Sequence, residues 1–129
     1  MPRAKQLSLT VPDRPGMLGE IATALGAKKV NIVGLCAATQ GGGGMIWMVV
    51  DKNAAAKKIL AANGWNATEE EVVAVTLSDA PGSLVRYATK LGKAGVNVTF
   101  AYAGSAGSAR KLTAYLGVSD IKAALKVKP

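Results

Sequence analysis

Two short turns contain the residues whose types and spacing could bind a small charged molecule. Each consists of an aspartate, a variable residue, a proline and a glycine: Asp13-Arg14-Pro15-Gly16 and Asp79-Ala80-Pro81-Gly82. A strand pattern precedes each turn and a helix pattern follows it. The start of a helix presents free backbone N–H groups and the positive end of the helix dipole, which together favour a carboxylate. The glycine also lets a ligand approach the backbone closely.

An asparagine follows each helix pattern at the beginning of the next predicted strand. These residues are Asn31 and Asn97. The amide offers both donors and an acceptor, which suits the ammonium and carboxylate groups of a free amino acid. Each feature also has a purely structural explanation, in which the aspartate caps the helix, the proline lies in its first turn and the asparagine belongs to a β-turn. The recurrence of both features together favours a ligand site.

The two turns belong to a sequence repeat without gaps. Residues 9–39 and 75–105 align at an offset of 66 residues. A repeat of this length indicates a duplicated supersecondary unit. The identical pairs are Thr10/Thr76, Asp13/Asp79, Pro15/Pro81, Gly16/Gly82, Leu18/Leu84, Ala22/Ala88, Thr23/Thr89, Leu25/Leu91, Gly26/Gly92, Val30/Val96 and Asn31/Asn97.

The remaining reactive side chains do not form a catalytic pattern. The chain contains no histidine, and its single cysteine, Cys36, lies in a predicted strand, where a buried thiol is usually inert. One cysteine cannot form an intramolecular disulfide, which fits a reducing cytoplasm. No two carboxylates are placed for acid–base catalysis or for an oxygen-ligand metal site. We therefore expect a protein that is not an enzyme and that has neither a metal nor another cofactor.

The net charge of +8 permits an anionic partner. The lysines are scattered and do not alternate with aromatic residues, as single-strand nucleic acid binding would require. This distribution favours a solvated surface over a nucleic acid interface. The first residues lack the apolar segment of a signal peptide, and no apolar run is long enough to span a membrane. The chain is therefore expected to be cytoplasmic, with no contact to a membrane.

Period and turn signals predict the order β-α-β-β-α twice, which is an α+β fold with antiparallel sheets and helices on one face. Glycines 41–44 feed a strand, so they predict a hairpin and not a phosphate loop, and a shorter hairpin is predicted at 104–107. The helices are expected to bury Leu18, Ile21, Ala22 and Leu25, and Leu84, Ala88 and Leu91. Each unit resembles a ferredoxin-like fold without its closing strand. Either the units exchange strands, or two three-stranded sheets lie edge to edge.

Both copies resemble ACT domains, the small regulatory modules that bind amino acids. The resemblance rests on the segments LTVPDRPGMLGEIATALGAKKVNIVGL and VTLSDAPGSLVRYATKLGKAGVNVTFAY. Each has the strand, the Asp-x-Pro-Gly turn with a following leucine, the helix and the hydrophobic-Asn-hydrophobic start of the second strand. The chain is also similar to stand-alone bacterial tandem ACT domain proteins, in the Gly-Trp segment before EEEVVAVTL and in FAYAG. The resemblance implies a first ACT domain at 1–68 and a second at 69–129.

The resemblance also implies which residues contact the ligand. It places the site at an interface, where the turn of one unit faces the second strand of another. Because Arg14 is replaced by Ala80 and Gly34 by Phe100, the two sites are expected to differ in charge and volume, and one of them could be inactive. The implied contacts are Asp13, Arg14, Pro15, Gly16, Met17, Leu18, Asn31 and Ile32 in the first copy, and Asp79, Ala80, Pro81, Gly82, Ser83, Leu84, Asn97 and Val98 in the second.

The leading hypothesis is a non-enzymatic regulatory module that binds a free amino acid or a similar metabolite. It would signal through the pairing of subunits or domains, as a homodimer and with a separate effector protein. The alternative is a protein-interaction module that has lost its ligand site and whose basic surface meets an acidic partner. Nucleic acid binding rests only on the net charge.

Overall fold

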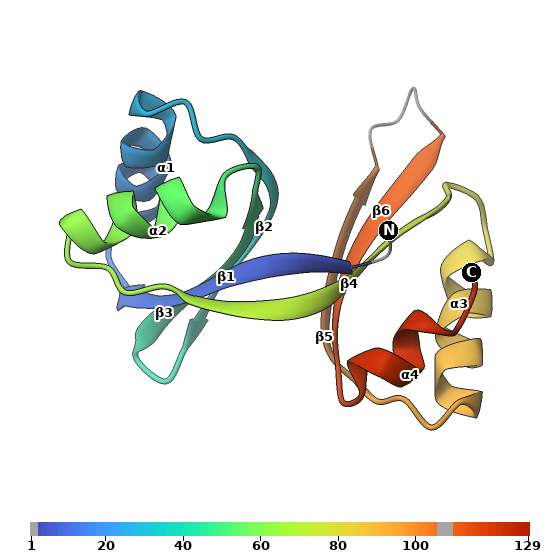
Figure 1. Cartoon of the computed structure of the whole chain (residues 1–129). Coiled ribbons are helices and arrows are strands. Elements are labelled where there is room, and N and C mark those ends of the chain that lie inside the picture. Colours follow the sequence, from blue (N-terminus) through green and yellow to red (C-terminus); the bar gives the residue numbers. More distant parts are fainter. Residues whose placement is uncertain (1–2, 106–109) are drawn as a thin grey trace. The chain divides into compact units, whose positions relative to one another are not determined.

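The computed structural model describes residues 3–105 and 110–129 and contains the predicted β-α-β-β-α order twice (Figure 1). The predicted hairpin at 104–107 lies partly outside these residues. Within them, no helix is long and apolar enough to cross a membrane. The elements are β1 (Arg3–Pro12), α1 (Met17–Ala27), β2 (Ile32–Gln40), β3 (Gly43–Val50), α2 (Asn53–Ala62), β4 (Thr68–Ser78), α3 (Ser83–Lys93), β5 (Val98–Ser105), β6 (Lys111–Val118) and α4 (Ile121–Leu125).

The chain divides into two compact units. The first unit is Lys5–Glu70, and the second unit is Glu71–Pro129 together with the beginning of β1. The beginning of β4 therefore belongs to the first unit, and the beginning of β1 belongs to the second. Only the ends of these two strands change units, whereas the sequence left open the exchange of whole strands as one of two arrangements. The division into ACT domains at 1–68 and 69–129 stays a prediction.

In the first unit the strand order is β2-β3-β1, with antiparallel pairing and with α1 and α2 on one face (Figure 1). The buried side chain of Gln6 donates a hydrogen bond of 2.7 Å from Nε2 to Oε1 of Glu70, at the beginning of β4. The alternating residues of β1 and β3 face the helices because side chains point to opposite faces along a strand. The core of the first unit consists of Leu7, Leu9, Val11, Met17, Ile21, Leu25, Val30, Ile46, Met48, Val50, Ala56 and Leu60.

In the second unit the order is β4-β6-β5, again antiparallel, with α3 and α4 on one face (Figure 1). At the beginning of β1, Arg3 forms an ion pair of 3.1 Å with Glu71. The core is separate from that of the first unit and contains Val73, Val75, Leu77, Tyr87, Leu91, Val96, Ala114, Leu116 and Ala124. The α+β, ferredoxin-like fold class is confirmed.

The predicted buried faces of the two long helices were wrong at two positions in each helix. Leu18 is 40% exposed and Leu84 is 45% exposed, and Ala22 and Ala88 are also exposed. The buried residues of α1 are instead Met17, Ile21 and Leu25, which lie four residues apart on one face. In α3 the same row is Ser83, Tyr87 and Leu91. Each helix starts directly after the glycine, so its first residue, Met17 or Ser83, is buried and the leucine that follows is exposed.

The glycines after β2 form the tip of a hairpin, as predicted. Gly41 and Gly42 connect β2 to β3 with φ angles of +59° and +82°. Two successive residues with positive φ are typical of a two-residue hairpin turn. This turn fixes the register of the hairpin, in which Gln40 pairs with Gly43 and Thr39 with Gly44.

Replacing Gly117 with alanine is expected to destabilise the second unit by about 1–3 kcal/mol, because the new methyl group would overlap its cross-strand partner. The ring of Phe100 lies directly over Gly117, in the space that a Cβ atom would fill. Urea denaturation measures the change. Gly104→Ala is the matched control, since its Cβ would have open space and its φ is not positive. Equal stability of the two variants would contradict the prediction.

Candidate functional site

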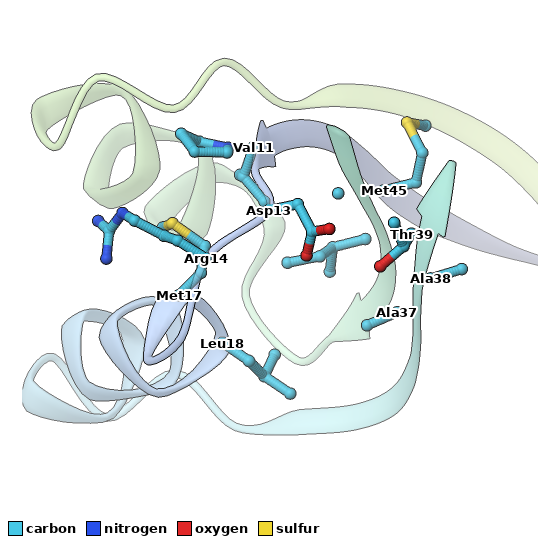
Figure 2. A pocket seen from close by; sticks show the side chains of 12 residues that line it. Val11, Asp13, Arg14, Met17, Leu18, Ala37, Ala38, Thr39 and Met45 are labelled. Atoms are coloured by element: carbon cyan, nitrogen blue, oxygen red, sulfur yellow. The ribbon is translucent and has the colours of Figure 1, made fainter. Parts of the chain in front are cut away.

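A pocket of about 240 Å³ lies in the first unit beside the Asp-x-Pro-Gly turn (Figure 2). The end of β1, the following turn, the start of α1, the end of β2 and the start of β3 all contribute to it. Antiparallel pairing places these segments at the same end of the sheet, where Pro12 and Gln40 both pair with Gly43. We call it the Asp13 pocket. It is lined by Val11, Pro12, Asp13, Arg14, Met17, Leu18, Ala37, Ala38, Thr39, Gly44, Met45 and Ile46.

The predicted capping role of the two aspartates was wrong. The residue that caps α1 is Gly16, with a φ of +85°, and Gly82 caps α3 with a φ of +88°. Neither helix has a side-chain hydrogen bond at its cap, and the proline precedes the helix in each case. The left-handed glycine lets the chain turn before the helix starts, so Asp13 stays outside the first helical turn. The N–H groups of that turn therefore keep no side-chain acceptor.

Two polar side chains face each other across the Asp13 pocket. Figure 2 shows the carboxylate of Asp13 and the hydroxyl of Thr39 turned toward one another. Neither side chain forms a hydrogen bond or an ion pair with another described residue. Asp13 is exposed at the mouth of the pocket. The pocket thus offers an anionic acceptor opposite a neutral hydroxyl.

Arg14 lines the pocket but points its guanidinium away from it (Figure 2). Both of its terminal nitrogens donate to the carboxylate of Glu20, with a distance of 3.0 Å between Nη2 and Oε1. These hydrogen bonds lower the pKa of the Glu20 carboxyl and raise the pKa of the Arg14 guanidinium. The positive charge of Arg14 is therefore paired on the outside of α1.

The other side of the pocket is apolar. The core residues Val11, Met17 and Ile46 contribute to it, together with the exposed Leu18. Met45 completes this side, and its sulfur accepts a hydrogen bond of 3.2 Å from the hydroxyl of Thr10. Such a surface suits an uncharged side chain of a ligand, whose burial removes apolar area from water.

The second turn has the same backbone but a different environment. Asp79 accepts a hydrogen bond of 2.6 Å from the hydroxyl of Ser105, and its backbone N–H donates to the carbonyl of Arg110. Arg86 replaces Glu20 of the first copy, and its Nη2 lies 3.4 Å from the hydroxyl of Ser83. The first residue of α3, Ser83, is buried, whereas Ala80 and Leu84 are exposed.

The two asparagines that the sequence placed in the site lie at the start of β2 and of β5, at the opposite end of the strand from the hairpin. Asn31 precedes β2, and the backbone N–H of Asn31 donates to Asp51. The backbone N–H of Asn97 likewise donates to Ser119. Along β2, Asn31 is separated from Thr39 by about 26 Å of extended chain. A single unit therefore does not bring Asn31 and Ile32, or Asn97 and Val98, to its own turn. That they face the turn of another unit stays a prediction.

Sequence reasoning missed the residues that β2 and β3 contribute to the pocket, above all Thr39 and Gly44. The signal was the glycine hairpin. A two-residue turn at Gly41 and Gly42 requires that Thr39 and Gly44 pair and lie near the end of β1. Elsewhere in the described ranges, no group of three or more histidine, cysteine, aspartate or glutamate side chains could hold a metal ion.

One family model matches a part of the chain that lies within the first unit. Residues 5–62 match the family model described as ACT domain. A protein from Bacteroides thetaiotaomicron superposes with a TM-score of 0.90 at 24% identity, over 98% of this chain and 86% of that one. The comparison with curated proteins found no match.

Two further solved structures are regulatory subunits of aspartate kinase. The ligand-free subunit from Thermus thermophilus superposes with a TM-score of 0.70 at 14% identity, over 95% of this chain and 88% of that one. The subunit from Thermus flavus gives 0.66 at 17% identity, over 98% and 94%. At these identities the likenesses show a common fold.

Proposed function

Because residues 5–62 match the ACT domain family model, we propose that the chain is a non-enzymatic regulatory protein that binds a free α-amino acid in the Asp13 pocket. The observation that carries the proposal is the open carboxylate of Asp13 opposite Thr39, beside a helix start that has no side-chain cap. Asp13 and Thr39 would hold the ammonium group of the amino acid. The free N–H groups at the start of α1 would hold its carboxylate.

The apolar side of the pocket supports an aliphatic side chain on the amino acid. The residues that would contact it include Met17, Leu18 and Met45, none of which carries a charge. The volume of about 240 Å³ is below the range of about 300–1,000 Å³ that holds drug-sized ligands. A single small amino acid suits this size better than a nucleotide or a peptide. Valine, leucine, isoleucine and methionine are therefore the candidates.

A thermal shift assay with each of the twenty L-amino acids tests the proposal. An amino acid present at about 100 times its Kd stabilises the folded chain by about 2.7 kcal/mol, which raises the Tm by at least about 5 °C. The same amino acid with an acetylated amino group is the control, since it lacks the positive charge that Asp13 would bind. No shift with any of the twenty, or an equal shift with the acetylated compound, would contradict the proposal.

Regulation requires that the bound amino acid change how the protein associates. We propose that the chain is a homodimer whose pairing, or whose contact with a separate effector protein, depends on the amino acid. Leu18, Val33 and Leu35 of the first unit are large apolar residues that are 40%, 52% and 40% exposed, which supports a pairing surface there. Light scattering with and without the amino acid would measure this dependence. A protein-interaction module without a ligand would associate equally in both conditions.

A further inference from the structure

We infer that each chain binds one amino acid, in the first unit only, because the second unit fills the corresponding space with its own side chains. The inference rests on the proposed function of the Asp13 pocket. It concerns the number of working sites and the residues that distinguish the two copies. The two hairpins differ in the residue that their register places beside the turn, and the two aspartates differ in their hydrogen bonds.

The first difference is the residue at the floor of the pocket. In the first unit Gly44 pairs with Val11 of β1 on one side and with Thr39 of β2 on the other. In the second unit Leu112 pairs with Leu77 of β4 and with Ser105 of β5. Leu77 and Ser105 are the repeat counterparts of Val11 and Thr39. Leu112 therefore occupies the position of Gly44 in the fold.

Leu112 places a bulky side chain in the second unit where Gly44 leaves the first unit without one. Leu112 is half-buried and packs against the core of the second unit, so it stands on the helix-covered face of the sheet. Gly44 lies at the same place and lines the pocket. A Cβ atom at Gly44 would lie 3.3 Å from Cγ2 of Val11 and 3.4 Å from the carbonyl oxygen of Val11. The pocket of the first unit thus depends on the missing side chain of Gly44.

The second difference is the partner of the aspartate. Asp79 accepts a hydrogen bond of 2.6 Å from Ser105, the residue that matches Thr39. An amino acid that bound to Asp79 would first have to break this bond. Among the described residues, Asp13 and Thr39 form no such bond and face each other across an open space (Figure 2). In the second unit the two side chains satisfy each other, whereas in the first unit both are available to an ammonium group.

The surroundings of the two turns differ in charge as well. The pair Arg14 and Glu20 balances the first turn, whereas their counterparts are Ala80 and Arg86. The Nη1 atom of Arg86 lies 3.2 Å from the place of a Cβ atom at Gly82. The positive charge of Arg86 beside the second turn would repel the ammonium group of an amino acid. At the first turn, the positive charge of Arg14 is balanced by Glu20.

Isothermal titration calorimetry of the full chain with each of the twenty L-amino acids, added singly, tests the inference. An amino acid that binds is expected to do so with a stoichiometry of one per chain. Gly44→Leu, which introduces the residue of the second copy, should abolish that binding, and the milder Gly44→Ala should weaken it at least tenfold. Ser105→Ala should leave it unchanged, because Ser105 belongs to the unit without a working site. Circular dichroism confirms that each variant folds.

The possible results separate the inference from the proposed function. A stoichiometry of two per chain, or full binding by a folded Gly44→Ala variant, would overturn the inference while leaving amino acid binding in place. Binding that Ser105→Ala weakens would also overturn it. If none of the twenty amino acids binds to the wild-type chain, the proposed function fails, and the inference fails with it.

Discussion

Replacing Asp13 with asparagine is expected to weaken amino acid binding by about 10- to 100-fold, measured by calorimetry as a change in Kd. A hydrogen bond to a charged group contributes about 1.5–3 kcal/mol, and each 1.4 kcal/mol is a factor of ten in affinity. Asparagine keeps the size of the side chain but removes the negative charge. Thr39→Val should cost about tenfold, because it removes only a neutral hydroxyl and keeps a β-branched residue at the end of β2.

The matched control for Asp13→Asn is Asp79→Asn, which removes the equivalent charge from the second turn. We expect it to leave the Kd unchanged and to lower the stability of the second unit by about 1 kcal/mol, since it weakens the bond to Ser105. Asp13→Asn should leave stability unchanged, because Asp13 is exposed and has no partner among the described residues. Equal affinities for wild type and Asp13→Asn would sink the assignment of the ammonium to this carboxylate.

The sequence predicts the fold well because the fold depends on local patterns. The repeat at an offset of 66 residues identifies the two copies, and the alternating residues before Pro12 predict a half-buried strand. The glycine hairpin follows from the requirement for positive φ at Gly41 and Gly42. None of these inferences needs a contact between distant parts of the chain.

The helix starts show where local patterns fail. An aspartate four residues before a helix suggests a cap, and a leucine two residues after a glycine suggests a member of the buried face. A left-handed φ at Gly16 changes both interpretations at once, because it turns the chain before the helix begins. Asp13 is then free to face the pocket, and Leu18 becomes its exposed wall. The conformation that makes the predicted cap wrong thus also places Asp13 at the pocket.

The remaining part of the site depends on pairing between strands. Thr39 and Gly44 reach the pocket only through the register of β2 and β3 with β1. A sequence repeat does not reveal that Leu112 is the counterpart of Gly44, because the hairpins differ in length and the aligned segments end at Ser105. The structure supplies this correspondence through the pairs Val11–Gly44 and Leu77–Leu112. For the same reason the sequence could not choose between exchanged strands and separate sheets.

The second large effect is expected from the identical pair Leu25 and Leu91, which are both fully buried. Leu25→Ala and Leu91→Ala should each lower the free energy of unfolding by about 2–5 kcal/mol, through lost burial and the cavity that remains. The two leucines belong to separate core clusters. Each substitution should therefore reduce amide protection chiefly in its own unit, as measured by native-state hydrogen exchange.

An equal loss of protection across both units in either variant would show that the chain unfolds as one cooperative body. If the units are separable, the pair also reports where the amino acid binds. An amino acid at the Asp13 pocket stabilises only the unit that contains it, because binding adds free energy to the folded state of that unit. It should then restore protection to the first unit of Leu25→Ala and leave the second unit of Leu91→Ala unprotected. The wild-type chain cannot make this distinction, since both of its units are already protected.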